Sequence, residues 1–178
     1  TGIAALDAAE DERAAILEEY RRTYELYDSP VARATFALAL GDAYAQTRRL
    51  PDALAQYETA GDAEGVLRAG CVAVELGREE RAVLLWQKLR ELAEKGKSHA
   101  AVAALMLRET EVSGFLLAAK PAGLAPALTH YVAGLRLWSD GDDRAAAELA
   151  QAGSDSAAWF APLAKRPRSA VVPPDEAP

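Results

Sequence analysis

The sequence predicts an all-α protein of about eight or nine helices. Alanine accounts for 41 of the 178 residues, and isoleucine occurs only at Ile3 and Ile16. Leucine, glutamate and arginine, which favour helices, make up much of the rest. Short breaks rich in glycine, proline, serine or aspartate separate segments whose apolar residues recur with the period of a helix. No stretch alternates apolar and polar residues as a strand does, so we expect no β-sheet.

The clearest helical pattern lies in residues 36–60. Leu40 and Tyr44 share one helix face, because residues four apart stack one turn above another, and Gly41 leaves a gap beside them. Pro51 suits the first turn of a second helix, where its missing N–H has no partner to lose. In that helix small and aromatic residues recur at i, i+4 and i+7: Ala53, Tyr57 and Ala60. We therefore expect two antiparallel helices that pack at close range.

This order of residues resembles the tetratricopeptide repeat, which places Leu-Gly, Tyr, Ala, an aromatic residue and Ala within about 34 residues. The match departs from the family at Ala37, where an aromatic residue is expected, and Phe36 stands one position away. The resemblance implies a solenoid of antiparallel helix hairpins with a right-handed superhelical path. It implies little about function, because such repeats hold partners of many kinds.

Two further repeats follow more loosely, so that the repeats span residues 34–61, 63–95 and 127–153. Aligning the second repeat on Gly77 fills the glycine, alanine, aromatic and small-residue positions of the repeat with Gly70, Ala82, Trp86 and Leu89. Aligning the third on Gly141 gives Gly134, Leu137, Ala146 and Ala150, with Ala150 where an aromatic residue is expected.

Residues 1–165 are expected to form one helical-repeat domain. A capping helix is predicted at 3–27, and a short cap at 157–165 covers the last apolar face. Residues 98–119 are apolar nearly all round and form either one long helix or a pair broken at Ser113–Gly114. Residues 166–178 carry proline without periodicity and are expected to be a tail or linker. Three residues are predicted to cap helix N-termini: Ser29, Asp62 and Ser98.

The composition excludes several classes of function. A net charge of −7 argues against a nucleic-acid binder, which needs a basic face. Cys71 is the single cysteine and stands in an apolar run, so we expect a buried side chain and no disulfide or multi-cysteine zinc site. The most apolar run, residues 100–107, is far shorter than the roughly 20 residues of a membrane span.

Several motifs suggest a phosphate or metal site but lack the residue spacing that such a site requires. Lys95-Gly96-Lys97-Ser98 lacks the upstream glycine and the strand of a phosphate loop. The acidic residues 140–143 lack the glycine and glutamate of a calcium loop, and we interpret them as a capping turn. His99 and His130 have no metal-ligand pattern around them. We therefore expect no metal, no cofactor and no enzymatic activity.

The resemblance implies a partner site on the concave face, lined by the first helix of each repeat. The asparagine and lysine clamp with which some members hold a peptide carboxylate is absent, since Asp42 and Cys71 occupy asparagine positions. An apolar or helical segment of a protein is therefore the expected partner. The same residues can equally pack against the chain's own first helix or tail. The implied site consists of Leu38, Asp42, Ala45, Gln46, Leu67, Cys71, Val74, Glu75, Tyr131, Leu135 and Trp138.

These observations favour a non-enzymatic scaffold that binds a protein segment or mediates complex assembly. A second hypothesis is a regulatory or substrate-positioning arm of a larger enzyme or transcription regulator, prompted by the start at Thr1 and the proline-rich end. A third is self-association through Tyr131, Trp138 or Trp159. We expect a soluble protein, and the sequence does not distinguish cytoplasm from periplasm.

Overall fold

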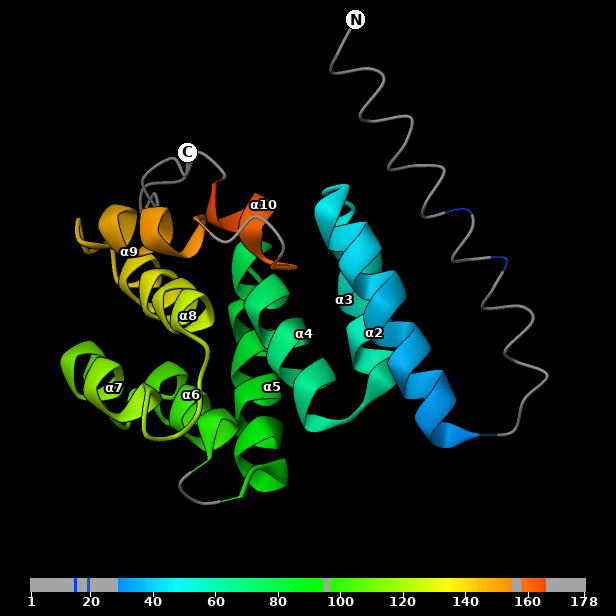
Figure 1. Ribbon diagram of the computed structural model, residues 1–178, viewed down its shortest axis with the longest axis horizontal. Helices are drawn as coiled ribbons and strands as arrows, with labels where there is room; N and C mark the ends of the chain where they lie inside the picture. Colours follow the sequence, from blue (N-terminus) through cyan, green and yellow to red (C-terminus); the bar gives the residue numbers. More distant parts are fainter. Residues whose placement is uncertain (1–14, 16–18, 20–28, 95–96, 155–157, 166–178) are drawn as a thin grey trace, which may run out of the picture.

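The computed structural model describes residues 15, 19, 29–94, 97–154 and 158–165, and these are all-helical, without a strand. The predicted capping helix 3–27 lies almost wholly outside the described residues, and the tail 166–178 entirely so. Figure 1 shows consecutive helices lying side by side along the molecule. The helices are α2 (Pro30–Gln46), α3 (Leu50–Ala60), α4 (Ala63–Glu75), α5 (Glu79–Leu92), α6 (Ser98–Met106), α7 (Val112–Ala119), α8 (Pro126–Ser139), α9 (Ala145–Ala152) and α10 (Ala161–Ala164).

Two of the three predicted N-caps are present. The Ser29 hydroxyl accepts a hydrogen bond from the Ala32 N–H, and the Asp62 carboxylate accepts one from the Gly65 N–H at 2.8 Å. Ser98 is instead the first residue of α6, and Lys97 takes the cap position without a side-chain hydrogen bond. The prediction of a Ser98 cap was therefore wrong by one position.

The segment 98–119 forms two helices, but the break does not lie at Ser113–Gly114, which are inside α7. It lies at residues 107–111. Arg108 adopts a left-handed conformation with φ of 64°, its N–H donates to the Leu105 carbonyl, and the Glu109 N–H donates to the Ala104 carbonyl. This pair of bonds is a Schellman motif, which satisfies the last carbonyls of α6 and ends the helix.

The same motif ends the first helix of every pair. The left-handed residues that follow α2, α4 and α8 are Arg48, Gly77 and Gly141, respectively, with φ between 60° and 71°. The pairs α2–α3, α4–α5, α6–α7 and α8–α9 are therefore built alike, and α6–α7 is a fourth helix pair that the sequence analysis left undecided.

Three of these pairs pack through a glycine. An ideal Cβ on Gly41 would lie 2.4 Å from the Tyr57 ring, and one on Gly70 would lie 2.4 Å from the Trp86 ring. In α8–α9 the Gly134 gap is filled by Leu149, at 2.6 Å. Ala150, the position predicted for that side chain, is exposed. Leu149 stands eight positions after the left-handed Gly141, whereas Tyr57 and Trp86 stand nine positions after Arg48 and Gly77.

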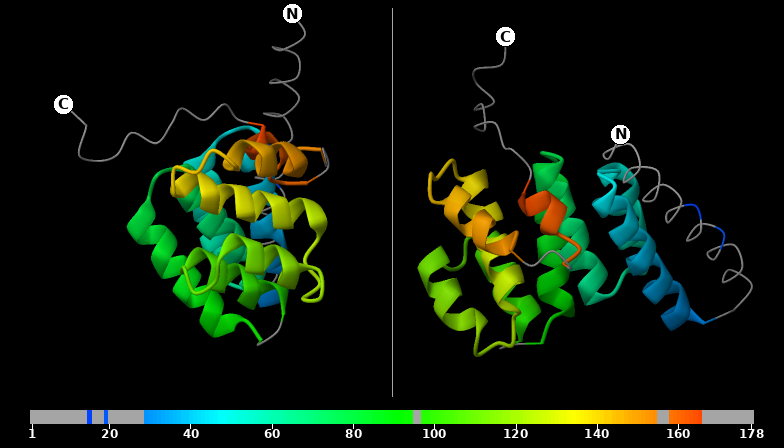
Figure 2. Two further views of the ribbon diagram at one scale, coloured as in Figure 1. Left: turned by 90° about the vertical axis from the view of Figure 1, so that its left-hand side faces the viewer. Right: turned by 45° about the horizontal axis from the view of Figure 1, so that its top comes forward.

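The first helices of the later pairs also contact one another: α4 contacts both α6 and α8, and α6 contacts α8. Residues 158–165 then cross back along the stack, and α10 contacts α9 at one side and α2 at the other, as Figures 1 and 2 show. The predicted cap 157–165 thus becomes a helix of only four residues. Trp159 and Phe160, which precede it, are buried.

Candidate protein-binding face

The structure divides the predicted partner-binding residues into two groups. Six are buried: Ala45, Leu67, Cys71, Glu75, Tyr131 and Leu135. The others keep part of their surface exposed: Leu38, Asp42, Gln46, Val74 and Trp138. Ala45 lies on α2 and the other five lie on α4 and α8, and all but Glu75, which accepts a hydrogen bond from Tyr131, belong to the hydrophobic core. The first helix and the tail, against which the sequence also allowed these residues to pack, lie almost wholly outside the described residues.

Arg68 of α4 joins three helices in a network of hydrogen bonds, and only 16% of its side chain is exposed. Its Nε donates to Glu64 Oε1 at 2.8 Å, and its Nη1 donates to Asp42 Oδ1. The Tyr57 hydroxyl of α3 donates to the same Asp42 oxygen at 2.8 Å. Sequence reasoning missed Arg68, although its spacing from Glu64 is that of an i, i+4 ion pair.

His99 of α6 extends the network, with its Nε2 3.2 Å from Glu64 Oε2. This hydrogen bond, together with the nearby Arg68, lowers the pKa of Glu64 below its ordinary value despite partial burial. Burial opposes the charge of Arg68, but hydrogen bonds to Asp42 and Glu64 outweigh it and raise the pKa of Arg68. Glu64 is therefore ionised near neutral pH, and the ion pair is a permanent feature of this face.

The buried tyrosine and cysteine beside this network stay protonated. Burial, followed by the charge of Asp42, raises the pKa of Tyr57, so its hydroxyl acts as a hydrogen-bond donor. Burial, with Glu75 and Glu64 nearby, raises the pKa of Cys71 well above its ordinary value. Cys71 is fully buried, as predicted, and its thiol is not a nucleophile.

Trp159 and Phe160 cover the network with a cluster of aromatic rings. The Trp159 ring packs edge-on against Tyr57 and Tyr131, each with ring centroids 5.9 Å apart. Phe160 stacks on Tyr131 at 4.7 Å, and the Arg68 guanidinium lies 5.4 Å from the Trp159 ring centroid. Below them the Tyr131 hydroxyl donates to Glu75 Oε1 at 3.1 Å.

We call this surface the inner face and define it by Asp42, Tyr57, Glu64, Arg68, Glu75, His99 and Tyr131. It combines charged and aromatic groups from α2, α3, α4, α6 and α8. Sequence reasoning named three of these seven as partner-binding residues, Asp42, Glu75 and Tyr131. Trp159 and Phe160 were predicted only as a lid.

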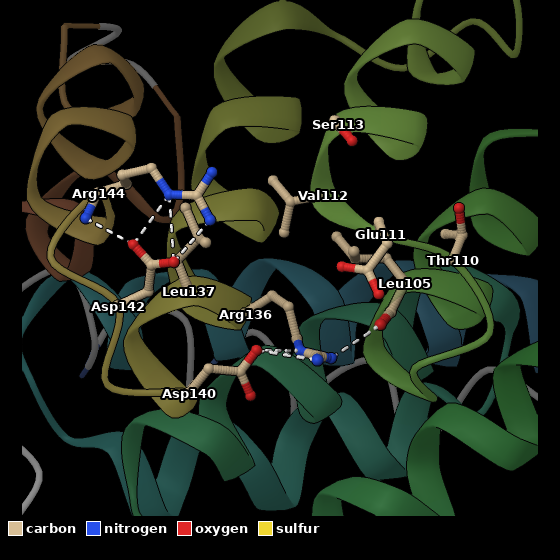
Figure 3. Close-up of a pocket in the computed structure, with 10 residues that line it drawn as sticks. All are labelled: Leu105, Thr110, Glu111, Val112, Ser113, Arg136, Leu137, Asp140, Asp142 and Arg144. Carbon is tan, nitrogen blue, oxygen red and sulfur yellow. Dashed lines mark hydrogen bonds and ion pairs between the residues drawn. The ribbon is translucent and has the colours of Figure 1, made fainter.

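A separate polar pocket lies where the α6–α7 and α8–α9 connections meet, shown in Figure 3. It encloses about 180 Å³ and is lined by Leu105, Thr110, Glu111, Val112, Ser113, Arg136, Leu137, Asp140, Asp142 and Arg144.

The arginines of this pocket are already neutralised by neighbouring carboxylates. Arg136 donates to Asp140 and to the Leu105 carbonyl, and burial lowers the pKa of Arg136. Asp142 accepts from the side chain and the N–H of Arg144, which lowers the pKa of Asp142 to about 2. Asp142 thus braces the turn that leads into α9, but α9 begins at its N-cap Arg144 without a side-chain cap, so the interpretation as a capping turn was wrong. Among the described residues no group of three or more potential ligands is placed to hold a metal ion.

Comparisons with protein-family models, with curated proteins and with solved structures found no match to this chain. None of the helices in the described part of the chain combines the length and the apolarity needed to span a membrane.

Proposed function

We propose that the protein is a non-enzymatic helical-repeat scaffold that binds a segment of a partner protein on its inner face. The observation that carries this proposal is the inner face itself. There, Tyr57 of α3, Arg68 of α4 and Tyr131 of α8 contact Trp159 in an apolar segment of eight residues, 158–165, which belongs to the chain itself. A face that holds one such segment has the shape and chemistry to hold another.

The repeat architecture supports the proposal. Four helix pairs share the same terminal motif, and three of them share the glycine gap that the tetratricopeptide resemblance implies. We infer a short solenoid of hairpins, a class of fold whose concave surfaces bind extended or helical segments. The chemistry supports it too, because the single cysteine is buried and protonated and the polar network is saturated by its own ion pairs.

The test starts from the full-length chain, immobilised and panned against a displayed library of random peptides. Enriched peptides are then titrated by calorimetry against wild-type protein, Leu38→Glu and Val83→Glu. Leu38 lies one turn from Asp42 on α2 and is partly exposed, whereas Val83 is 45% exposed on α5. We expect Leu38→Glu to weaken binding by about tenfold or more and Val83→Glu to leave it unchanged.

Two results would contradict the proposal: a selection that enriches no binding peptide, or peptides whose affinity does not depend on Leu38. Leu67→Glu is unsuitable for this test because Leu67 is 1% exposed, and a carboxylate there would be buried without a partner.

Self-association receives less support. Of the three aromatic residues considered for it, Tyr131 and Trp159 are buried within the protein, which leaves only the partly exposed Trp138.

A further inference from the structure

Building on the proposed function, we propose that residues 158–165 are an internal ligand that occupies the inner face until a partner displaces them. The partner segment then shares their chemistry. It presents two adjacent aromatic side chains, followed by small residues and proline.

Apolar and aromatic side chains anchor the segment. Trp159, Phe160 and Leu163 are 8%, 4% and 1% exposed, and the two aromatic rings account for five contacts, with Tyr57, Tyr131, Arg68 and each other. Four backbone hydrogen bonds lie within residues 158–165 themselves. Aromatic anchors in an apolar surface are how grooves on helical proteins bind peptide segments.

The face beneath stays satisfied when the segment leaves. Arg68 is held by Asp42 and Glu64, and the Tyr57 and Tyr131 hydroxyls are held by Asp42 and Glu75. None of these bonds involves residues 158–165, so displacing the segment leaves them in place. Ion pairs that are partly buried add little net stability, but they fix the geometry of the groups they join. The inner face is thus organised in advance for an incoming segment.

The helix pairs do not depend on this segment either. Their glycine contacts lie between α2 and α3, α4 and α5, and α8 and α9, whereas α10 contacts α2 and α9. Loss of the segment therefore opens one face and leaves the close-packed pairs in place.

Charge complementarity defines the partner further. Asp42, Glu64 and Glu75 place three carboxylates on the inner face against the one guanidinium of Arg68. An acidic segment would be repelled by these carboxylates. We therefore expect an aromatic segment without acidic side chains.

The first test uses wild-type full-length protein and hydrogen–deuterium exchange read by mass spectrometry. The probe is an isotope-labelled synthetic peptide with the sequence of residues 157–166, and the control peptide carries alanine at both aromatic positions. Excess probe should speed exchange of the protein's own residues 158–165 while α4 and α8 stay protected. The control peptide should change nothing. If residues 158–165 open only together with α4 and α8, they are part of the global fold and the inference is overturned.

The second test uses the full chain with Trp159→Ala and Phe160→Ala, and follows the fluorescence anisotropy of the same probe after dye labelling. The variant should bind about tenfold to a hundredfold more tightly than wild type, because the competing segment no longer holds the face closed. Circular dichroism checks that the variant remains helical. If it does not fold, the exchange experiment on wild-type protein decides alone.

The two proposals fail differently. If a library peptide binds through Leu38 while residues 158–165 stay protected from exchange, the internal-ligand proposal is wrong. The proposal of a protein-binding scaffold would not be affected. A folded variant that binds the probe no better than wild type would also overturn the internal ligand. Failure of every peptide to bind would remove both.

Discussion

At the scale of single residues, the close packing of the helix pairs depends on three missing side chains. Gly41, Gly70 and Gly134 leave room for Tyr57, Trp86 and Leu149, and each of these larger residues is buried. The sequence indicates these gaps because glycine in a helix interior is unfavourable and needs a reason.

We predict that Gly41→Ala destabilises the protein by about 1–3 kcal/mol, although alanine favours helices, because its Cβ would overlap a fully buried Tyr57 ring. Gly70→Ala, opposite Trp86, should behave alike. Urea denaturation measures the effect.

The matched control is Gly114→Ala in α7, whose Cβ would meet only the Thr110 hydroxyl at 3.1 Å. It should be neutral, or stabilise by up to about 1 kcal/mol through helix propensity. Equal effects at Gly41 and Gly114 would contradict the packing account.

Glu64 makes stability depend on pH at the acidic end. Its pKa lies below the ordinary value of 4.5 when folded, so its contribution is present above that value and is lost as pH falls through the folded pKa. We predict that Glu64→Gln flattens the fall in unfolding free energy between about pH 5 and pH 3. Denaturation at a series of pH values measures it. Glu91→Gln, an exposed change on α5, should leave the slope as in wild type.

At the scale of elements, the ends of helices follow local rules that the sequence only partly displays. Gly77 and Gly141 indicate helix ends, since glycine adopts the left-handed conformation without strain. Arg48 and Arg108 also adopt the left-handed conformation, with φ of 60° and 64°. No sequence rule predicts this conformation for arginine. This is why the end of α6 was not located and why the pair α6–α7 remained undecided.

We predict that Asp62→Ala costs about 1 kcal/mol, because it removes the hydrogen bond to the Gly65 N–H that caps α4. Chemical denaturation gives the magnitude. Asp62→Asn keeps an acceptor at that position and should retain most of the stability. A loss from Asp62→Asn as large as that from Asp62→Ala would show that the charge, rather than the cap, matters.

At the scale of the whole molecule, the halves of the chain are joined across the inner face. Glu75 and Tyr131 are separated by 56 residues in sequence and share a buried hydrogen bond between α4 and α8. Trp159 then contacts both Tyr57 and Tyr131, so a residue near the end of the chain bridges the first and last helix pairs.

We predict that Tyr131→Phe costs about 1–2 kcal/mol, because a buried carboxylate loses one of its donors. Combining it with Glu75→Gln should give a non-additive loss of about 0.5 kcal/mol or more, measured by a double-mutant cycle in urea. Thr59→Val removes an exposed hydroxyl that bonds only to the Ala55 carbonyl within α3, and it should change stability by less than about 0.5 kcal/mol. Additive effects of Tyr131→Phe and Glu75→Gln would mean that the two side chains are not coupled.

The sequence predicted the helices better than the site. Ser29, Pro51 and Asp62 correctly marked the starts of α2, α3 and α4, because caps and breakers act on the residues next to them. The family resemblance placed Leu67, Cys71 and Leu135 on an open concave face, whereas the structure buries all three. Nothing local distinguishes an apolar side chain that faces a partner from one that faces the chain's own later helix.

By itself the sequence determined that the described chain is helical, where α2, α3 and α4 begin, and that Gly41 leaves a gap for a close neighbour. These are properties of neighbours along the chain, governed by backbone conformation and residue size. Only the tertiary structure decided that α4 meets α8, that Arg68 joins Asp42 to Glu64, and that Trp159 and Phe160 cover them. Those contacts join residues far apart in sequence, and their burial depends on how every intervening helix pair is stacked.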